Sequence, residues 1–436
     1  MVVLTLLCSM SCLCGLRNVA ASDLPLTLQE AVETALAQHP TLRIGAATIA
    51  AAQQRVAQQQ AGYLPRGGYT YSFTHQQRPV SAAVGGVRLD GEQQRVRSVA
   101  QVFDFHSTNV SLSQVLFDFG RTLDSIRSAA ATVEARVADL ETTRQVVILN
   151  TKQAYYGLLS AQRLLRVAEE TLQQNQKHLE VAQARLEVGV APRFDVTQVR
   201  VQVSNARLNL VSAQNTVALG RETLRTAMGS TQPFAFTLVD ALDRRSVTFN
   251  DADLVPMAYA NRSELGSLRA QQKAAAMRTS ALRKQYLPLL SSNAQYSWTG
   301  RGYPLQDGWN LGVTVSLPLF DDILTTAQVG EAQADAQGLA AQEDDLRQRI
   351  ALEVRSSLLE LGRADESIRV SQETEVQARE NLALAEGRYQ VGVGNIIELT
   401  DAQTSVTSAR ANAIQALYNF KTALVQLEKA TARSLD

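Results

Sequence analysis

The residue types that most often carry enzyme chemistry form no recognisable set in this sequence. The four histidines are His39, His75, His106 and His178, and each lies in a different segment. No Ser-His-Asp set, no cluster with metal-ligand spacing and no glycine-rich phosphate loop can be read from the chain. The sequence therefore predicts a protein that is not an enzyme and that has neither a metal nor a cofactor.

Three acidic residues have a more informative position, next to two matching turns. One Val-Gly-Val turn is centred on Gly189 and another on Gly392, and Asp195 and Glu398 follow where a helix is expected to begin. Acids in the first turn of a helix offset the positive end of its dipole. Asp401 lies one turn beyond Glu398, so both carboxylates can share one face of that helix. Dipole capping is therefore one of two explanations that stay open for Asp195 and Glu398.

The chain is a tandem duplication. Tyr63-Leu64-Pro65 returns as Tyr286-Leu287-Pro288, 223 positions later. Leu116-Phe117-Asp118 returns as Leu319-Phe320-Asp321, only 203 positions later. The first copy therefore holds about twenty more residues between the two motifs, and a longer loop is the simplest expectation for them.

We expect residues 22–230 to form the first repeat and residues 231–436 the second. Each repeat is predicted to contain a helix, a β-hairpin, a long helix and a returning helix, in that order. The repeat is too long for a solenoid, whose units run to roughly 20–50 residues. The two copies should instead be related by a pseudo-symmetry.

The N-terminal segment predicts export. Val2 to Leu16 is an apolar run too short to span a bilayer permanently, and Val19-Ala20-Ala21 supplies small residues before a cleavage point at Ser22. We therefore expect residues 1–21 to be a signal peptide, with a buried N-terminal helix or a lipidated Cys12 as the alternatives. All three cysteines lie in this segment, so the mature chain would have none, which suits an oxidising compartment.

Long amphipathic helices are predicted in both repeats. Leucine recurs every seven residues from Leu158 to Leu186, and a second register of alternating three- and four-residue steps begins at Val196. This pattern is typical of coiled-coil packing. The first long helix can be traced back almost to Arg121, so its roughly 65 residues would extend about 95 Å. A helix from about Thr325 to Tyr389 is expected in the second repeat.

Alternating apolar residues upstream of each long helix predict strands with one apolar face. They include Trp309, Leu311 and Val313 in the second repeat, and a Gly-rich loop from Ser81 to Ser98 is expected in the first. The aromatic residues of these hairpins fit the interfacial girdle of a membrane barrel. The girdle candidates are Tyr69, Tyr71, Trp298 and Trp309. A soluble sheet packed on the helices is the alternative.

Two hairpins supply only four strands, whereas a membrane barrel needs about eight or more. Open strand edges are too costly in lipid, because their backbone groups stay unpaired. If these strands span a membrane, several copies of the chain must close one barrel.

The order of these motifs, and their duplication, resembles the TolC-type outer-membrane efflux protein family from Leu26 to about Ala432. The family's typical phrases are present as Leu116-Phe117-Asp118-Phe119-Gly120-Arg121 and as Gly387-Arg388-Tyr389-Gln390-Val391-Gly392-Val393-Gly394. The resemblance implies a mostly α fold with a membrane β-barrel portion. Duplicated helical hairpins would form a periplasmic α-barrel, and two β-hairpins per chain would contribute to a shared twelve-stranded barrel in a homotrimer.

The resemblance also implies a function, location and partners. The chain would be the outer-membrane channel of a tripartite efflux or type I secretion system, with a large periplasmic portion. Its partners would be outer-membrane lipid, a periplasmic adaptor protein and an inner-membrane pump of the RND or ABC type. Nucleic acid is not expected as a partner, since 42 basic and 42 acidic residues give no net charge. A periplasmic or surface coiled-coil structural protein or adhesin is the alternative.

The resemblance assigns a site to the helix turns. Asp195, Glu398 and Asp401 would line the periplasmic aperture, where rings of carboxylates favour cations. Some members lock the closed end with an arginine at the position of Gly394. This chain lacks that arginine, and Arg193 is the nearest basic candidate for a gating role.

Overall fold

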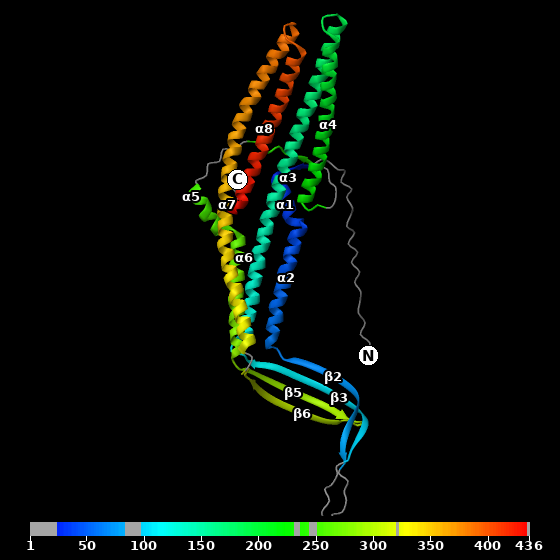
Figure 1. Ribbon diagram of the computed structural model, residues 1–436, viewed down its shortest axis with the longest axis vertical. Coiled ribbons are helices and arrows are strands. Elements are labelled where there is room, and N and C mark those ends of the chain that lie inside the picture. The colour runs from blue at the N-terminus through cyan, green and yellow to red at the C-terminus, as the bar shows by residue number, and fades with distance from the viewer. Residues whose placement is uncertain (1–23, 83–96, 231–235, 244–250, 320–321, 434–436) are drawn as a thin grey trace, which may run out of the picture. The chain divides into compact units, whose positions relative to one another are not determined.

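A computed structural model describes residues 24–82, 97–230, 236–243, 251–319 and 322–433 (Figure 1). The expected signal peptide and most of the expected loop from Ser81 to Ser98 lie outside the described residues. The chain divides into two compact units. The tip unit holds residues 1–44, 142–262 and 350–436, and the sheet unit holds residues 45–141 and 263–349. Each unit is thus built from segments of both predicted repeats.

Helices dominate the described chain and confirm the predicted long helical hairpins (Figure 1). The longest two have 67 and 69 residues, and each is followed by a tight turn and a shorter returning helix. The helices are α1 (Leu28–Gln38), α2 (Pro40–Gln60), α3 (Arg121–Glu187), α4 (Arg193–Ala227), α5 (Asp251–Asn261), α6 (Ser263–Arg283), α7 (Asp322–Gln390) and α8 (Ile396–Thr431). Two short 3-10 turns, Ala61–Tyr63 and Lys284–Tyr286, precede strands. Among the described residues, no helix combines the length and the apolar character that a membrane crossing requires.

The returning helices bury their apolar registers. In α8 every position of the three-four pattern, from Leu399 to Leu427, is buried. In α4 the same pattern is buried at five of its positions, and Gly220 lets this helix approach Leu158 of α3 closely. A Cβ added at Gly220 would lie only 3.2 Å from the Leu158 side chain. The small residues of these registers therefore serve close helix packing.

The leucine ladder of α3 is less completely covered. Leu158 is fully buried, whereas Leu165, Leu172, Leu179 and Leu186 are only half-buried. The equivalent positions of α7 include Ile368, which is fully buried. The two copies therefore use the same heptad positions in different surroundings.

A small parallel sheet completes the tip unit, and the sequence analysis did not predict it. Strand β1 (Leu24–Leu26) pairs with β4 (Phe236–Leu238). Tyr155 of α3 is fully buried beneath them, and its hydroxyl donates to the backbone oxygens of Leu26 and Val239 at 2.9 and 2.7 Å. This tyrosine thus anchors the linker segments of both repeats on the long helix.

The sheet unit contains one antiparallel sheet of four strands in the order β2-β3-β5-β6. Its strands are β2 (Arg66–Ala82), β3 (Arg97–Phe117), β5 (Leu289–Gly300) and β6 (Gln306–Ser316). Each repeat contributes one hairpin, and β3 of the first repeat pairs with β5 of the second. Strands β2 and β6 are the edges of this sheet. The outer side of each edge strand pairs with no other described strand.

The first hairpin corrects the expectation that the extra residues of the first repeat form a longer loop. Strands β2 and β3 have 17 and 21 residues, against 12 and 11 for β5 and β6. Most of the extra residues therefore lengthen the strands. Side-chain contacts between paired residues stabilise the lengthened part of the β2–β3 hairpin. One example is His75, whose Nδ1 lies 2.7 Å from the carboxylate of Asp104 on the opposite strand.

Candidate functional site

The two helix turns of the tip unit share one backbone design. At the first turn, the N–H of Val190 donates to the oxygen of Arg185, and at the second, the N–H of Val393 donates to the oxygen of Arg388. Gly189 and Gly392 lie in the left-handed region, with φ of 75° and 81°. Glycine adopts this conformation without strain, which explains its place in both copies.

A small apolar cluster holds the tips of the two hairpins together. It combines residues of the first repeat with residues of the second, all of them buried. Its members are Ala182, Val196, Val199, Tyr389, Ile396 and Leu399. The start of α4 and the start of α8 are therefore fixed relative to the ends of α3 and α7.

Arg185 adds a polar link across the same junction. Its Nη1 donates to the backbone oxygen of Tyr389 at 2.5 Å, and its guanidinium carbon lies 4.7 Å from the centre of the Tyr389 ring. The link therefore combines a charge-assisted hydrogen bond with a cation–π contact.

Asp195 is half-buried in the first turn of α4, where its carboxylate offsets the helix dipole. The preceding Pro192 has no side chain that could cap this helix, so the acid is the only first-turn group of that kind. Burial first, and then the nearby charge of Asp195, raise the pKa of the Tyr389 hydroxyl. Asp195 and Arg185 of the first repeat thus both act on Tyr389 of the second.

Glu398 and Asp401 differ in their surroundings. Glu398 lies in the first turn of α8, whose N-cap Asn395 accepts a hydrogen bond from the Glu398 N–H at 2.8 Å. Its carboxylate forms an ion pair with Arg388, 3.0 Å from Nε to Oε1. The carboxylate of Asp401 is exposed and has no hydrogen bond or ion pair with any described residue.

The three predicted aperture acids therefore share one end of the hairpins, but within one chain they are not in contact. No hydrogen bond or ion pair joins Asp195 to Glu398 or Asp401 among the described residues. Arg193, the predicted gating residue, opens α4 with an exposed guanidinium that has no partner in the described part of the chain.

Sequence reasoning missed Arg185, Arg388 and Tyr389 as site residues. A signal was present, because Arg185 and Arg388 are equivalent by the 203-residue offset and both precede the Val-Gly-Val turns. Their different partners could not be read from that equivalence. Arg388 pairs with Glu398 of its own repeat, whereas Arg185 bonds to the other repeat.

The four-stranded sheet has one apolar face and one polar face. The strand register aligns Tyr69, Val110, Tyr296 and Trp309 in one row across all four strands. The neighbouring row on the opposite face consists of Gly68, Ser111, Gln295 and Asn310. Gln295 donates to Asn109 on this polar face at 3.1 Å.

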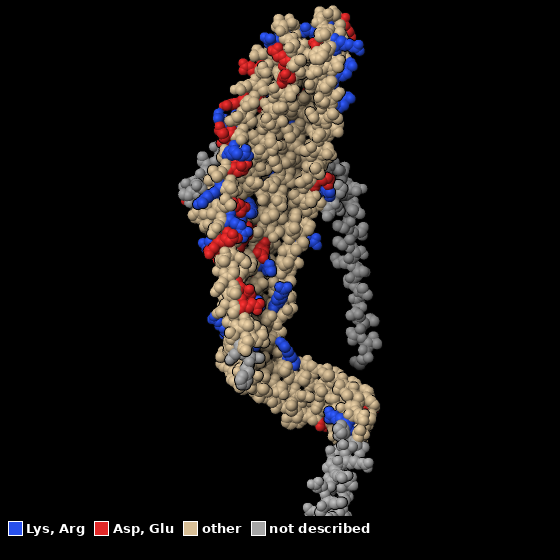
Figure 2. All heavy atoms as spheres, viewed as in Figure 1, with Lys and Arg blue, Asp and Glu red and all other residues tan. Residues whose placement is uncertain are grey.

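The apolar face is exposed in the single chain. Tyr69 and Trp309, on the two edge strands, are 69% and 75% exposed. Tyr71 and Trp298 lie two residues further along in the adjacent row. The four girdle candidates therefore occupy two adjacent rows of one face. Figure 2 shows few charged side chains on the face of the sheet in view, and many along the helices.

Metal chemistry has no site in the described residues, which contain no group of three or more His, Cys, Asp or Glu side chains able to hold an ion. The arrangement at the tips can instead present carboxylates beside a link between two hairpins. The sheet can present a largely apolar face, which also carries Asp307 beside Trp298.

Comparison with known proteins agrees with this architecture. The chain is 25% identical to the outer membrane protein TolC of Salmonella enteritidis over 411 residues, covering 90% of this chain and 79% of that protein. It is 24% identical to the toluene efflux pump outer membrane protein TtgC of Pseudomonas putida over 409 residues, covering 92% and 82%.

Solved structures show the same fold. The channel CusC superposes with a TM-score of 0.79 at 19% identity, over 93% of this chain and 92% of that chain. The outer membrane protein VceC of Vibrio cholerae gives a TM-score of 0.74 at 18% identity, over 94% and 97%. The family described as outer membrane efflux protein matches residues 31–230 and 254–433, one segment in each copy of the duplication. With most of its length matched in this way, the chain belongs to the outer membrane efflux protein family.

Proposed function

We propose that this outer-membrane efflux channel works as a homotrimer in which three copies of the sheet close one barrel of twelve strands. The observation that carries the proposal is the pair of open edges, β2 and β6, on a sheet with one apolar face. Edge backbone groups must be paired in lipid, and a second copy of the chain offers a matching edge. The polar face would then line the channel, and the apolar face would meet the lipid.

In this proposal the channel is a passive exit duct. Substrates would reach it from an inner-membrane pump through a periplasmic adaptor, and the long helices would extend into the periplasm. The curated relatives include a toluene efflux pump component and an antibiotic efflux pump component, and this supports small-molecule efflux as the first activity to test. A coiled-coil rod or adhesin is disfavoured, because it has no use for a sheet with an exposed aromatic face.

The aperture of the duct is assigned to the hairpin tips. Asp195, Glu398 and Asp401 would repeat three times around the axis and form rings that favour cations. The exposed Asp401 has no competing partner in the described chain, so it is the strongest candidate for a pore-facing charge. The girdle residues Tyr69, Tyr71, Trp298 and Trp309 would mark the membrane interfaces.

The duplication predicts the register between protomers. Within the hairpins, Arg66 lies opposite Ser113 and Leu289 opposite Ser316, which are equivalent pairs under the two repeat offsets. Between the repeats, Val110 lies opposite Tyr296. The same offsets carry this pairing to Val313 of one protomer opposite Phe73 of the next. Thr314 would then lie opposite Ser72 on the polar face.

The test is oxidative cross-linking of a Ser72→Cys/Thr314→Cys variant in membranes. Paired strand residues have Cα atoms close enough for a disulfide, so a ladder ending at a covalent trimer is expected. The control is Thr70→Cys/Asn310→Cys, whose sites would be about 20 Å apart in this register. A well-behaved uncross-linked monomer for both variants would contradict the shared barrel.

Loss of the gene should also increase susceptibility to exported compounds, and the wild-type chain should restore resistance only together with its adaptor and pump. Restoration without any pump would contradict the duct mechanism.

A further inference from the structure

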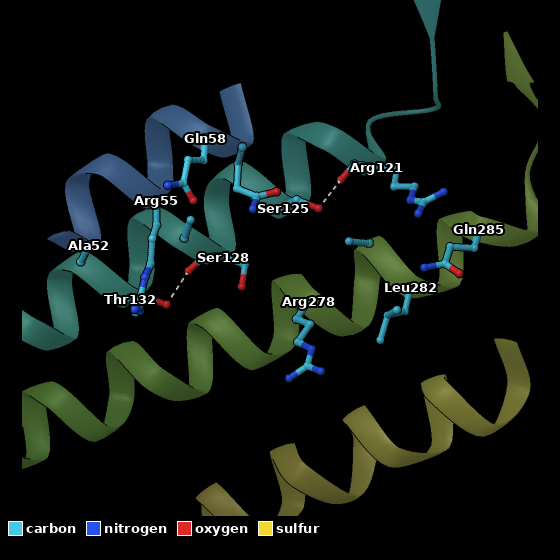
Figure 3. Close-up of a pocket in the computed structure, with 13 residues that line it drawn as sticks. Ala52, Arg55, Gln58, Arg121, Ser125, Ser128, Thr132, Arg278, Leu282 and Gln285 are labelled. Carbon is cyan, nitrogen blue, oxygen red and sulfur yellow. Dashed lines mark hydrogen bonds between the residues drawn. The ribbon is translucent and has the colours of Figure 1, made fainter. Parts of the chain in front are cut away.

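A cavity of about 480 Å³ in the sheet unit is lined by three arginines from three helices. Arg55 comes from α2, Arg121 from the first residue of α3, and Arg278 from α6 (Figure 3). No acidic residue lines this cavity. All three arginines are exposed, so solvent screens their mutual repulsion in part, and no acid of the lining offsets it.

The described residues supply only part of a compensating charge, because the Asp118 carboxylate attracts Arg121 without forming a hydrogen bond or ion pair with it. The guanidinium groups of Arg55, Arg121 and Arg278 form no hydrogen bond or ion pair with any side chain that the structure describes. Other arginines of the sheet unit are paired, for example Arg269 with Glu343 at 3.2 Å and Arg136 with Asp139 at 3.0 Å. The cavity arginines take no part in these ion pairs.

The acids nearest in sequence to Arg121 form their hydrogen bonds and ion pairs with other groups, although the charge of Asp118 acts on Arg121 at longer range. Asp118 accepts hydrogen bonds from the N–H groups of Gly120 and Thr122, at 3.0 and 2.7 Å. Asp124 pairs with Lys284 at 2.5 Å. Arg278 also lines a neighbouring cavity to which Asp335 contributes, but no ion pair joins these two described residues.

Composition explains why no carboxylate is available. No Asp or Glu occurs between Glu33 and Asp90, a stretch that contains all of α2. None occurs between Glu264 and Asp307, a stretch that contains nearly all of α6. Helix α2 therefore has no acidic residue, and α6 has none after Glu264.

The cavity also presents neutral hydrogen-bond donors. The amide side chains of Gln58, Gln59 and Gln285 line it and have no hydrogen bond to a described residue. The hydroxyls of Ser125 and Ser128 instead donate to backbone oxygens of Arg121 and Ala274. The free groups are therefore three guanidinium forks and three amides, which together suit an anion with several acceptor oxygens.

We propose that this cavity binds a phosphate-bearing anion. The planar guanidinium fork binds phosphate oxygens through two parallel hydrogen bonds, and each of the three arginines carries one such fork. The cavity lies in the size range of small-molecule sites, about 300–1,000 Å³, and so has room for a phosphate together with the group it esterifies.

Two kinds of ligand could supply the phosphate group. Arg121 follows the end of β3 by four residues, and Gln285 precedes β5 by four, so the cavity adjoins the sheet. If the sheet lies in the membrane, which rests on the proposed function, the phosphate of a phospholipid headgroup is within reach. A soluble phosphate ester is the other source, and it does not depend on the membrane placement.

The test measures binding to the purified full chain in maltoside detergent, using glycerol 3-phosphate and dihexanoyl phosphatidylglycerol as probes. An Arg55→Gln/Arg121→Gln/Arg278→Gln variant should bind both probes about tenfold or more weakly than wild type, since it removes all three guanidinium forks. The matched control is Arg200→Gln/Arg207→Gln/Arg221→Gln, three exposed α4 arginines that lie outside the cavity, and it should bind like wild type.

The outcomes distinguish a lipid from a soluble ligand, and they also test whether the site exists. Preference for the lipid supports a headgroup site, and equal binding of the soluble ester supports a soluble ligand. A triple Arg→Lys variant keeps the charge and loses the forks, so it should bind with intermediate affinity and covers the case in which the glutamine variant fails to fold. The proposed site is overturned if the wild-type chain binds neither probe. It is also overturned if the α4 control variant loses as much affinity as the cavity variant. The cross-linking test of the trimer is independent of this result.

Discussion

Arg185 at the end of α3 reaches Tyr389 at the end of α7, with a hydrogen bond of 2.5 Å to the backbone oxygen and the guanidinium over the ring. This contact joins the first hairpin to the second at their tips. The equivalent arginine of the second repeat, Arg388, pairs with Glu398 of the same repeat instead. The duplication is therefore broken at the point where the proposed aperture would open and close.

Arg185→Ala should loosen the tips and raise the resting conductance of the proposed channel in planar bilayers. The substitution removes a charged hydrogen bond, at roughly 1.5–3 kcal/mol, and a cation–π contact of about 0.5–2 kcal/mol. Arg185→Lys should restore part of the closed behaviour. Arg193→Ala is the control, because the Arg193 guanidinium has no described partner. If Arg193→Ala opened the channel and Arg185→Ala did not, the lock would lie at Arg193.

Asp401→Asn should lower the preference for cations more than Glu398→Gln does. The Glu398 charge is already paired with Arg388, whereas Asp401 is exposed and without a partner in the described chain. The double variant should also weaken block by multivalent cations, with the trimer intact. Ion selectivity from reversal potentials measures the effect. Unchanged selectivity in the double variant would leave both acids as helix-end charges.

Much of the helical architecture was predictable, because it depends on local spacing. Heptad steps and the absence of breakers predict α3 and α7, and the Val-Gly-Val motifs predict the turns after them. The α8 register is buried at every position from Leu399 to Leu427, as a coiled-coil seam should be. The placement of Asp195 and Glu398 in first helical turns follows from the same local signals.

The remainder depends on contacts between distant segments. Nothing local to Leu24–Leu26 indicates that it pairs with Phe236–Leu238 over Tyr155. The extra residues of the first repeat were expected to form a loop, but most of them extend β2 and β3. The hydrogen-bonded pairing of two strands continues where residues on opposite strands can interact, as His75 and Asp104 do. The contact between Arg185 and Tyr389 could not be predicted either, because local spacing does not show that the end of α3 lies beside the end of α7.

Ile368→Ala should lower the thermal midpoint of the assembled protein more than Leu165→Ala does. The two positions are equivalent in the repeats, but Ile368 is fully buried and Leu165 is half-buried. Truncation of a buried isoleucine costs about 2–5 kcal/mol through lost transfer energy and the cavity left behind. Heat-modifiable gel migration measures the midpoint. An equal loss at both positions would mean that assembly buries Leu165 as deeply as Ile368.

His178 should make the helical tunnel less stable in mild acid. Its side chain is largely buried on α3, and its Nε2 lies 3.8 Å from a Glu386 oxygen that already accepts from Gln174 at 2.9 Å. Burial lowers the pKa of His178, although the Glu386 charge acts in the opposite direction. The folded chain therefore binds this proton less readily than the unfolded chain.

The sign of the pH effect follows from that direction. With the folded pKa below the ordinary value of about 6.5, the contribution to stability is complete above that value and is lost as the pH falls through the folded pKa. Thermal midpoints between about pH 7.5 and pH 5.0 should therefore drop further for wild type than for His178→Gln, which cannot take up the proton. Glu386→Gln removes the opposing charge and should steepen the acid loss. A wild-type midpoint that rises in acid relative to His178→Gln would instead show that protonated His178 forms a net stabilising ion pair with Glu386.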